Sequence, residues 1–227
     1  MPMRCDEVFM GGCDHPVGPG RWLHDDSEWT RGYDRPHGPY LHHNPPEHLL
    51  RQLAADADWR VRFLVANHPV TGPGLIDRLA QDPWPQVRWE GLRRTSSLAL
   101  LRAARDDGDR VAVASNDRCP AALLERWGSD PYHILRDRVV GHPSTPAWVV
   151  DAAVGDPDGS VRALAAFRTR SPEVIAAAAA SPDRGLRCGA ARNPACPPAL
   201  RDRLARDEDP AVRAAATRPP APSAGRR

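Results

Sequence analysis

The sequence predicts an all-α solenoid of about seven two-helix repeats, and two observations carry this prediction. An acid or Ser is followed five residues later by Val or Leu seven times between Asp56 and Arg213. These Val/Leu positions lie 24 to 26 residues apart, and a fixed period of this length is typical of stacked repeats. We call them anchors: Val61, Val87, Val111, Leu135, Val161, Leu186 and Val212. Because such arrays offer an extended surface, the architecture favours binding over catalysis.

The first helix of each repeat is expected to begin at the recurring acid or Ser, which would be its N-cap. Such a side chain accepts hydrogen bonds from free backbone N–H groups, and Pro suits the next position because it has no N–H to lose. Asp156-Pro157 is one example. Residues three and four positions after the anchor should share its buried face, as Leu164 and Ala165 do after Val161.

A turn follows, often around Pro, and a second helix with paired apolar residues begins near another Pro. Pro73, for example, precedes Leu75 and Ile76. The turn residues His68 and His142 are expected to be exposed loop residues rather than members of a catalytic set.

Two repeats fit the pattern less well. The second places Glu90 and Gly91 where apolar residues are expected, and its turn at 95–97 lacks Pro. The fourth places Arg138 on the expected inner face. We interpret these positions as local distortions or sites of altered curvature.

The array is expected to span residues 46–217, between an irregular N-terminal cap of residues 1–45 and a disordered tail of residues 218–227. The start, 1–12, lacks the apolar core of a secretory signal, and the longest apolar run, 174–180, is too short to span a bilayer. Five scattered Cys, an odd number, fit a reducing compartment. The predicted location is therefore the cytoplasm, with no membrane partner.

The charge of the array is nearly balanced. All 31 basic residues are Arg, which indicates the codon usage of a GC-rich, bacterial-like genome. Residues 46–217 hold 24 Arg against 22 acidic residues. A nucleic-acid binder normally shows a much larger basic excess, so a nucleic-acid partner is possible but not favoured.

An Arg follows the anchor in most repeats, and these side chains would form a column along the array. The column could bind phosphates or an acidic partner. Alternatively, each guanidinium could bind carbonyls or the capping acid of an adjacent repeat, which we favour because acids recur with the same period. The candidate binding residues are Arg62, Arg88, Arg136, Arg162, Arg187 and Arg213.

The N-terminal 45 residues contain thiols and imidazoles that could form a zinc site, since these ligands suit tetrahedral zinc. Their spacing lacks the close Cys pair typical of such sites, so we favour an irregular cap that covers the first repeat. The candidate ligands are Cys5, Cys13, His15 and His24. The later thiols, Cys119, Cys188 and Cys196, are expected to be small buried apolar groups.

The repeat pattern resembles the leucine-rich repeat variant family, most closely at residues 58–69 and 156–165, and roughly over residues 46–217. The resemblance implies a right-handed superhelix of alternating α and 3-10 helices without strands. Ordinary paired-helix solenoids such as HEAT arrays remain an alternative.

Some members of this family carry an N-terminal domain with a cysteine-bound 4Fe–4S cluster, and the segment from Cys5 to Cys13 resembles it distantly. A cluster of that type needs four thiolates, and only two Cys precede Cys119. No cofactor is therefore expected, with zinc or a remnant iron–sulfur site at the N-terminus as the alternative.

The sequence contains none of the common catalytic motifs, so an enzyme is not expected. The leading hypothesis is a non-catalytic scaffold that binds a macromolecule, above all a protein, along its surface. One alternative is a nucleic-acid-binding rod that uses the Arg column. Another is a metal- or redox-responsive interaction protein with an N-terminal Cys/His site.

Overall fold

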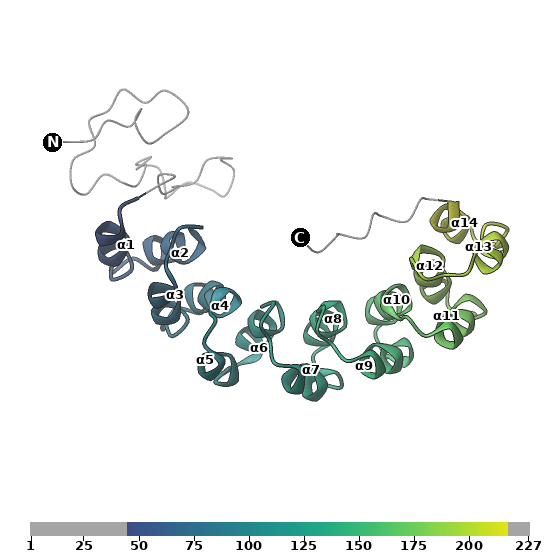
Figure 1. Cartoon of the computed structure of the whole chain (residues 1–227), viewed down its shortest axis with the longest axis horizontal. Coiled ribbons are helices and arrows are strands. Elements are labelled where there is room, and N and C mark those ends of the chain that lie inside the picture. The colour runs from purple at the N-terminus through teal and green to yellow at the C-terminus, as the bar shows by residue number, and fades with distance from the viewer. Residues whose placement is uncertain (1–44, 218–227) are drawn as a thin grey trace, which may run out of the picture. The chain divides into compact units, whose positions relative to one another are not determined.

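The computed structural model describes residues 45–217, and over this range it contains fourteen α-helices, one 3-10 helix and no strand (Figure 1). The predicted all-α fold of paired-helix repeats is confirmed. The predicted cap and tail lie outside the described residues, apart from the last residue of the cap. Within the described part of the chain, no helix has the length and apolar character that a membrane crossing requires.

Seven of the helices carry the recurring motif, and we call them the anchor helices. They are α2 (Trp59–Asn67), α4 (Pro85–Arg94), α6 (Asp107–Ala114), α8 (His133–Gly141), α10 (Gly159–Arg168), α12 (Arg184–Arg192) and α14 (Pro210–Thr217). The second helices are α1 (Glu47–Leu53), α3 (Pro73–Leu79), α5 (Leu98–Arg102), α7 (Ala121–Trp127), α9 (Ala147–Ala152), α11 (Pro172–Ala179) and α13 (Pro198–Leu204). In the described range, 3-10 geometry is confined to η2 (Ala153–Gly155), which continues α9.

The chain divides into two compact units, residues 1–100 and 101–227. In the first unit, α2 packs against α4, and α3 packs against both. In the second unit, α6, α8, α10, α12 and α14 form one row in which each helix packs against the next, while α11 lies on the other side of this row and packs against α10, α12 and α13 (Figure 1). Helices this short are marginal alone, so packing between repeats must hold them.

In α2, α4, α8, α10 and α12 the recurring acid or Ser lies two residues before the N-cap, whereas the recurring Asp106 is itself the N-cap of α6. The N-cap of α10 is Asp158, whose side chain accepts hydrogen bonds from the backbone N–H groups of Ser160 and Val161. The preceding Asp156 instead accepts the N–H of Asp158 at 2.8 Å, forming a turn that leads into the helix. The predicted N-cap assignment is therefore confirmed for Asp106 and was wrong by two residues in the other five helices. At the start of α10, one carboxylate shapes the turn and the next one caps the helix.

The anchor helices bury the anchor and the residues four and five positions later. Val161, Ala165 and Ala166 of α10 are fully buried, whereas Leu164 is only partly buried. The inner face therefore lies about one residue beyond the predicted positions. This explains Arg138 of α8, which is exposed. The same register buries Val87, Leu135 and Val212 completely and leaves Val61 and Leu186 half-buried.

The third repeat has a different register from the predicted one. Asp109 of α6 is 2 % exposed and occupies the anchor position, while the predicted anchor Val111 is half-buried. The side chain of Asp109 accepts the backbone N–H of Arg105 at 3.0 Å, and its own N–H donates to Asp106 at 2.8 Å. This reciprocal cap explains why a carboxylate is tolerated at a buried helix start.

The second repeat is a point of close approach between helices. A Cβ added to Gly91 of α4 would lie 2.3 Å from the backbone N of Ala80 at the end of α3. Only Gly permits this packing. The adjacent Glu90 is buried, and its carboxylate accepts hydrogen bonds from Arg93 at 3.1 and 2.5 Å. Gly91 therefore serves close packing, and Glu90 is buried in a pair with Arg93 of the same helix. Altered curvature at this repeat stays a prediction.

Candidate functional site

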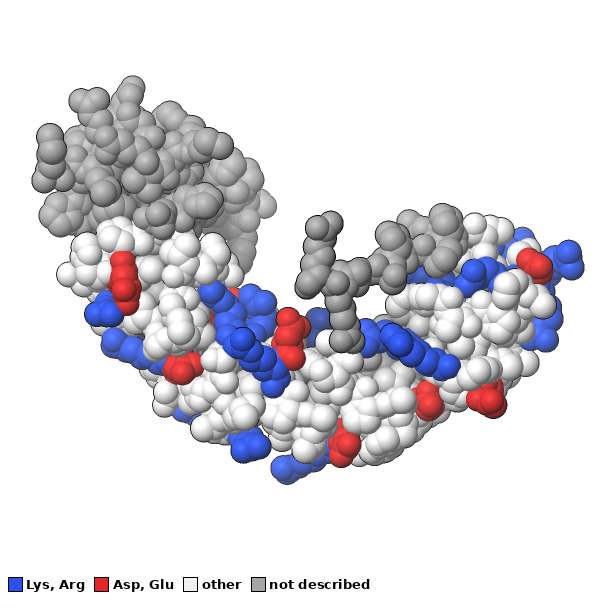
Figure 2. Space-filling model, in the orientation of Figure 1, with Lys and Arg blue, Asp and Glu red and all other residues white. Residues whose placement is uncertain are grey.

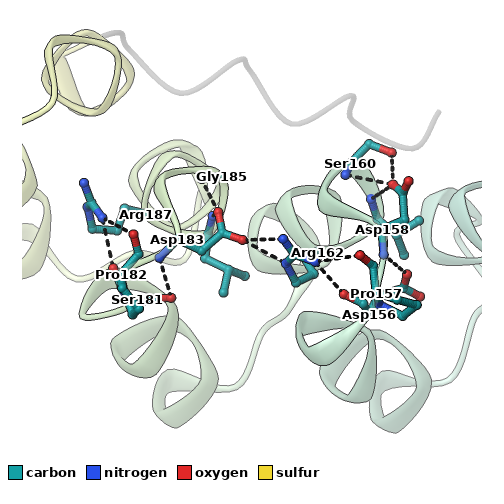
Figure 3. Close-up of polar contacts among 12 residues, drawn as sticks. Asp156, Pro157, Asp158, Ser160, Arg162, Ser181, Pro182, Asp183, Gly185 and Arg187 are labelled. Carbon is teal, nitrogen blue, oxygen red and sulfur yellow. Dashed lines mark hydrogen bonds and ion pairs between the residues drawn. The ribbon is translucent and has the colours of Figure 1, made fainter.

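The Arg after the anchor joins its own repeat to the next one. In α10, Arg162 Nη1 donates to the carbonyls of Asp156 and Pro157 at 2.7 and 3.0 Å (Figure 3). Its Nε and Nη2 donate to Asp183 of the next repeat at 2.8 and 2.6 Å (Figure 3). One guanidinium therefore fixes the turn at the start of its own helix and pairs with a carboxylate one repeat later.

The same arrangement recurs in both units, and we call it the Arg–Asp ladder. Arg62 donates to Asp82 at 2.7 and 2.9 Å in the first unit. The pairs Arg136–Asp156 and Arg187–Asp207 belong to the second unit, with shortest distances of 2.7 and 2.9 Å. Charge-assisted bidentate pairs of this kind fix geometry as well as adding stability. The side chains of Arg136 and Asp156 are only 8 % and 5 % exposed, so this pair is shielded from salt and water.

The ladder shifts the pKa values of its members as expected for ion pairs. The hydrogen bond from Arg162 lowers the pKa of the Asp183 carboxyl, and that from Arg187 lowers the pKa of Asp207. The hydrogen bond to Asp207 raises the pKa of Arg187 in return. Asp183 and Asp207 are therefore charged at neutral pH.

One repeat begins with Ser181 instead of an acid, and the structure shows how the ladder continues. Ser181 Oγ still accepts the N–H of Asp183 at 3.1 Å, so the turn is kept (Figure 3). Asp183 is the N-cap of α12, and one oxygen of its carboxylate accepts backbone N–H groups at the start of that helix. The other oxygen accepts hydrogen bonds from Nε and Nη2 of Arg162 (Figure 3). The N-cap carboxylate therefore replaces the missing acid, with 21 instead of 20 residues between the partners.

Arg110 is a member of the ladder that the predicted repeat pattern did not include. Arg110 in α6 pairs with Asp130 of the next repeat and with Asp107 at 2.5 Å. Arg110 was not among the predicted binding residues because the anchor of this repeat was predicted at Val111, two residues after the position that Asp109 occupies. The separation of 20 residues between Arg110 and Asp130 is the signal that could have identified it.

The remaining two candidates, Arg88 and Arg213, make the same local contacts. Arg88 Nη1 donates to the carbonyls of Asp82 and Pro83 at 3.1 and 3.3 Å. Arg213 Nη1 donates to those of Asp207 and Glu208 at 2.7 and 2.9 Å. All six candidate arginines thus contact their own helix start. Whether they also bind a partner stays a prediction.

A second set of contacts joins repeats at the opposite edge, where the anchor helices end. Asn193 Nδ2 donates to the carbonyls of Ala166 and Thr169 at 2.9 and 2.8 Å. His142 Nε2 lies 2.9 Å from the carbonyl of Asn116, and its Nδ1 accepts the N–H of Ser144 at 3.1 Å. Because Nδ1 is an acceptor, Nε2 must donate. The turn residues His68 and His142 are 8 % and 4 % exposed, so their predicted exposure was wrong.

His142 and Asn193 lie seven residues after their anchors, and in two other repeats this position holds an Arg. Arg168 Nη1 and Nη2 donate to the carbonyls of Gly141 and His142 at 2.8 and 3.1 Å. In the first unit, Arg94 donates to Ala66 and Pro69 in the same way. The carbonyls belong to the end of the preceding anchor helix, where a positive charge is favourable. Burial and the nearby charge of Arg170 lower the pKa of Arg168.

The second unit also carries a groove of about 490 Å³ between α7 and α9. Val149, Ala152 and Ala153 line it together with the ladder pair Arg136–Asp156. Trp148 lies at the groove and is 61 % exposed, the highest value among the exposed large hydrophobic residues of the described chain. An exposed Trp beside an apolar hollow is typical of a protein-binding surface.

The candidate metal ligands Cys5, Cys13, His15 and His24 lie outside the described residues. The three later thiols are free; Cys119 and Cys196 are buried, and Cys188 is half-buried. Burial raises the pKa of Cys119 to about 12, as expected for a thiol that serves as a small apolar group.

Comparison with solved structures finds a repeat protein to which this chain is similar. A solved structure described as "a leucine-rich repeat variant with a novel repetitive protein structural motif" is 27 % identical to this chain, with a TM-score of 0.55. The match covers 75 % of this chain and 70 % of that chain. No family model matches the sequence, and no curated protein does.

Proposed function

We propose that this chain, whose repeat region is similar in fold and sequence to a leucine-rich repeat variant, is a non-catalytic scaffold that binds another protein. Repeat arrays present long surfaces to partners rather than enclosed reaction chambers. The observation that carries the proposal is Trp148, 61 % exposed beside the groove of about 490 Å³ in the second unit. Large Trp side chains of this kind often supply most of the energy at protein interfaces.

The internal contacts of the Arg–Asp ladder support a protein partner over a nucleic acid. Arg62, Arg136, Arg162 and Arg187 each donate to two carbonyls and a carboxylate, so binding phosphate would break contacts between repeats. The groove offers an apolar surface instead, which suits a side chain of a partner protein.

Selection from a displayed peptide library against the full chain tests the proposal. Trp148→Ala should lower the affinity for the selected peptides by about thirtyfold, which is the typical effect of removing one central Trp from an interface. Trp84→Ala is the matched control, because Trp84 is also exposed, at 41 %, but lies in the first unit. Ligands that bind wild type and Trp148→Ala equally would contradict the proposal.

A further inference from the structure

The two edges of the second unit differ in how their arginines are neutralised. On the edge where anchor helices begin, the Arg–Asp ladder pairs Arg110, Arg136, Arg162 and Arg187 with carboxylates. Toward the opposite edge, a second group has no carboxylate partner among the described residues. We call these four the open arginines: Arg138, Arg168, Arg170 and Arg192.

The open arginines come from three consecutive repeats that pack side by side. Arg168 binds the carbonyls of Gly141 and His142, one helical turn beyond Arg138 on α8. Arg192, the last residue of α12, places its guanidinium over the ring of Phe167 on α10, 5.7 Å from the centroid. Figure 2 shows Arg side chains in blue over the α8–α10 stretch, with acidic side chains drawn lower on the same face.

The guanidinium of Arg168 is held in place yet keeps donors to spare. The two carbonyl bonds use two of the five N–H donors that a guanidinium carries. Arg138, Arg170 and Arg192 are exposed. One fixed cation with Arg170 close to it, and with Arg138 and Arg192 on the two adjacent anchor helices, is suited to bind carboxylates, which Arg binds in bidentate fashion.

We propose that the open arginines form a docking surface for an extended acidic segment of a partner protein. The inference rests on the proposed scaffold function and names the chemistry of one partner. Charge complementarity carries it, since the repeat array around this local patch is nearly neutral, with 24 Arg against 22 acidic residues over residues 46–217. A nucleic acid would call for a much larger basic excess.

The spacing of the repeats adds a rule for the partner. Packed helices lie about 10 Å apart, and a peptide in the polyproline II conformation advances by about 3.1 Å per residue with three residues per turn. Acidic residues at every third position of such an extended segment would therefore share one face and meet successive repeats. The half-buried ring of Phe167 lies beneath the guanidinium of Arg192 and offers an apolar contact to the part of the segment between two acidic residues.

Binding of two synthetic peptides to the full chain tests the inference. The first carries four Glu at every third position in a Gly/Ser background, and its isomer carries the four Glu consecutively. The triple variant Arg138→Gln, Arg170→Gln, Arg192→Gln should lower affinity for the spaced peptide by about tenfold, because each exposed pair contributes modestly. Wild type should bind the spaced peptide more tightly than the isomer.

A control of equal charge change separates the patch from net charge. Arg126, Arg203 and Arg206 are exposed and lie on or just after second helices of the same unit. Changing these three to Gln should leave affinity within about twofold. Equal losses in the two triple variants, equal binding of the two peptides, or tighter binding of single-stranded DNA than of the spaced peptide would each overturn the inference. The scaffold proposal is tested separately: if the peptides selected from the library lose affinity in Trp148→Ala, that proposal holds whatever the outcome for the open arginines.

Discussion

At the scale of single residues, Asp207 shows how one carboxylate connects two repeats. One oxygen accepts the N–H of Asp209 at 2.9 Å and shapes the turn before α14. The carboxylate also accepts Arg187 Nε and Nη2 at 2.9 and 3.1 Å. Both side chains of this pair are 11 % exposed. Replacing the carboxylate by an amide therefore removes the shielded ion pair, while the amide oxygen can still accept the N–H that shapes the turn. The contribution of the ion pair can thus be measured apart from that of the turn.

We expect Asp207→Asn to lower the free energy of unfolding at pH 7 by about 2 kcal/mol, since it removes the close counter-ion of a shielded Arg and leaves only the exposed Glu208, 3.7 Å from Arg187 Nη2. The hydrogen bond from Arg187 depresses the pKa of Asp207 below its ordinary value of 3.8. A depressed carboxyl pKa stabilises the fold above pH 3.8, and this stability is lost as pH falls through the folded-state pKa. The variant should therefore lose less stability than wild type between pH 4 and 2.5.

Urea unfolding at pH 7, 4 and 2.5 measures both effects. Asp202→Asn is the control, because Asp202 is exposed on α13 and should change stability by less than about 0.5 kcal/mol. Parallel pH profiles for wild type and Asp207→Asn would show that this pair does not control acid stability.

At the scale of helices, close packing decides where glycine is required. Gly91 sits on α4 where α3 ends, and an added Cβ would lie 2.3 Å from Ala80 N and 2.5 Å from Ala80 Cα. Gly74 on α3 has no atom within 4 Å of the same added position. The two glycines therefore separate helix propensity from the approach of two helices.

Gly91→Ala is expected to destabilise the first unit by about 1 to 3 kcal/mol, because backbone atoms cannot move away as a flexible side chain would. Gly74→Ala should instead stabilise by up to about 1 kcal/mol, the gain in helix propensity. Thermal unfolding of the two variants beside wild type measures the difference. If both substitutions stabilise the protein, then α4 does not approach α3 as closely as described.

At the scale of the whole molecule, stability is distributed over neighbouring repeats. Within the second unit, α10 packs against α8 and α12, and α12 packs against α14. Val161 of α10 is fully buried, in a cluster with Val140, Val150 and Ala165. A disturbance at Val161 should therefore be felt most by adjacent repeats.

Val161→Asp is expected to lower the free energy of unfolding by at least about 4 kcal/mol, since it buries an unpaired charge. Hydrogen exchange should show loss of protection in α8, α10 and α12 before α14. Arg170→Gln, at an exposed position, should change stability by less than about 0.5 kcal/mol. Equal melting temperatures for the two variants would contradict the placement of the anchors inside the array.

Features that recur with the period of the repeat could be predicted from the sequence alone. The period of the anchors predicted paired helices, because helical periodicity and stacking leave a regular apolar pattern. The recurrence of acids and Arg with the same period favoured internal pairing. The Arg110–Asp130 pair could have been found from its separation of 20 residues.

Contacts between repeats that leave no periodic pattern in the sequence were decided only by the tertiary structure. The burial of His142, the anchor role of Asp109 and the close approach at Gly91 each depend on a neighbouring helix, not on the local pattern. The open arginines also depend on the tertiary structure, because the sequence around an Arg does not show whether a carboxylate lies beside it in the fold. Periodicity is local and survives in the sequence, whereas burial and ion pairing depend on which side chains packing brings together.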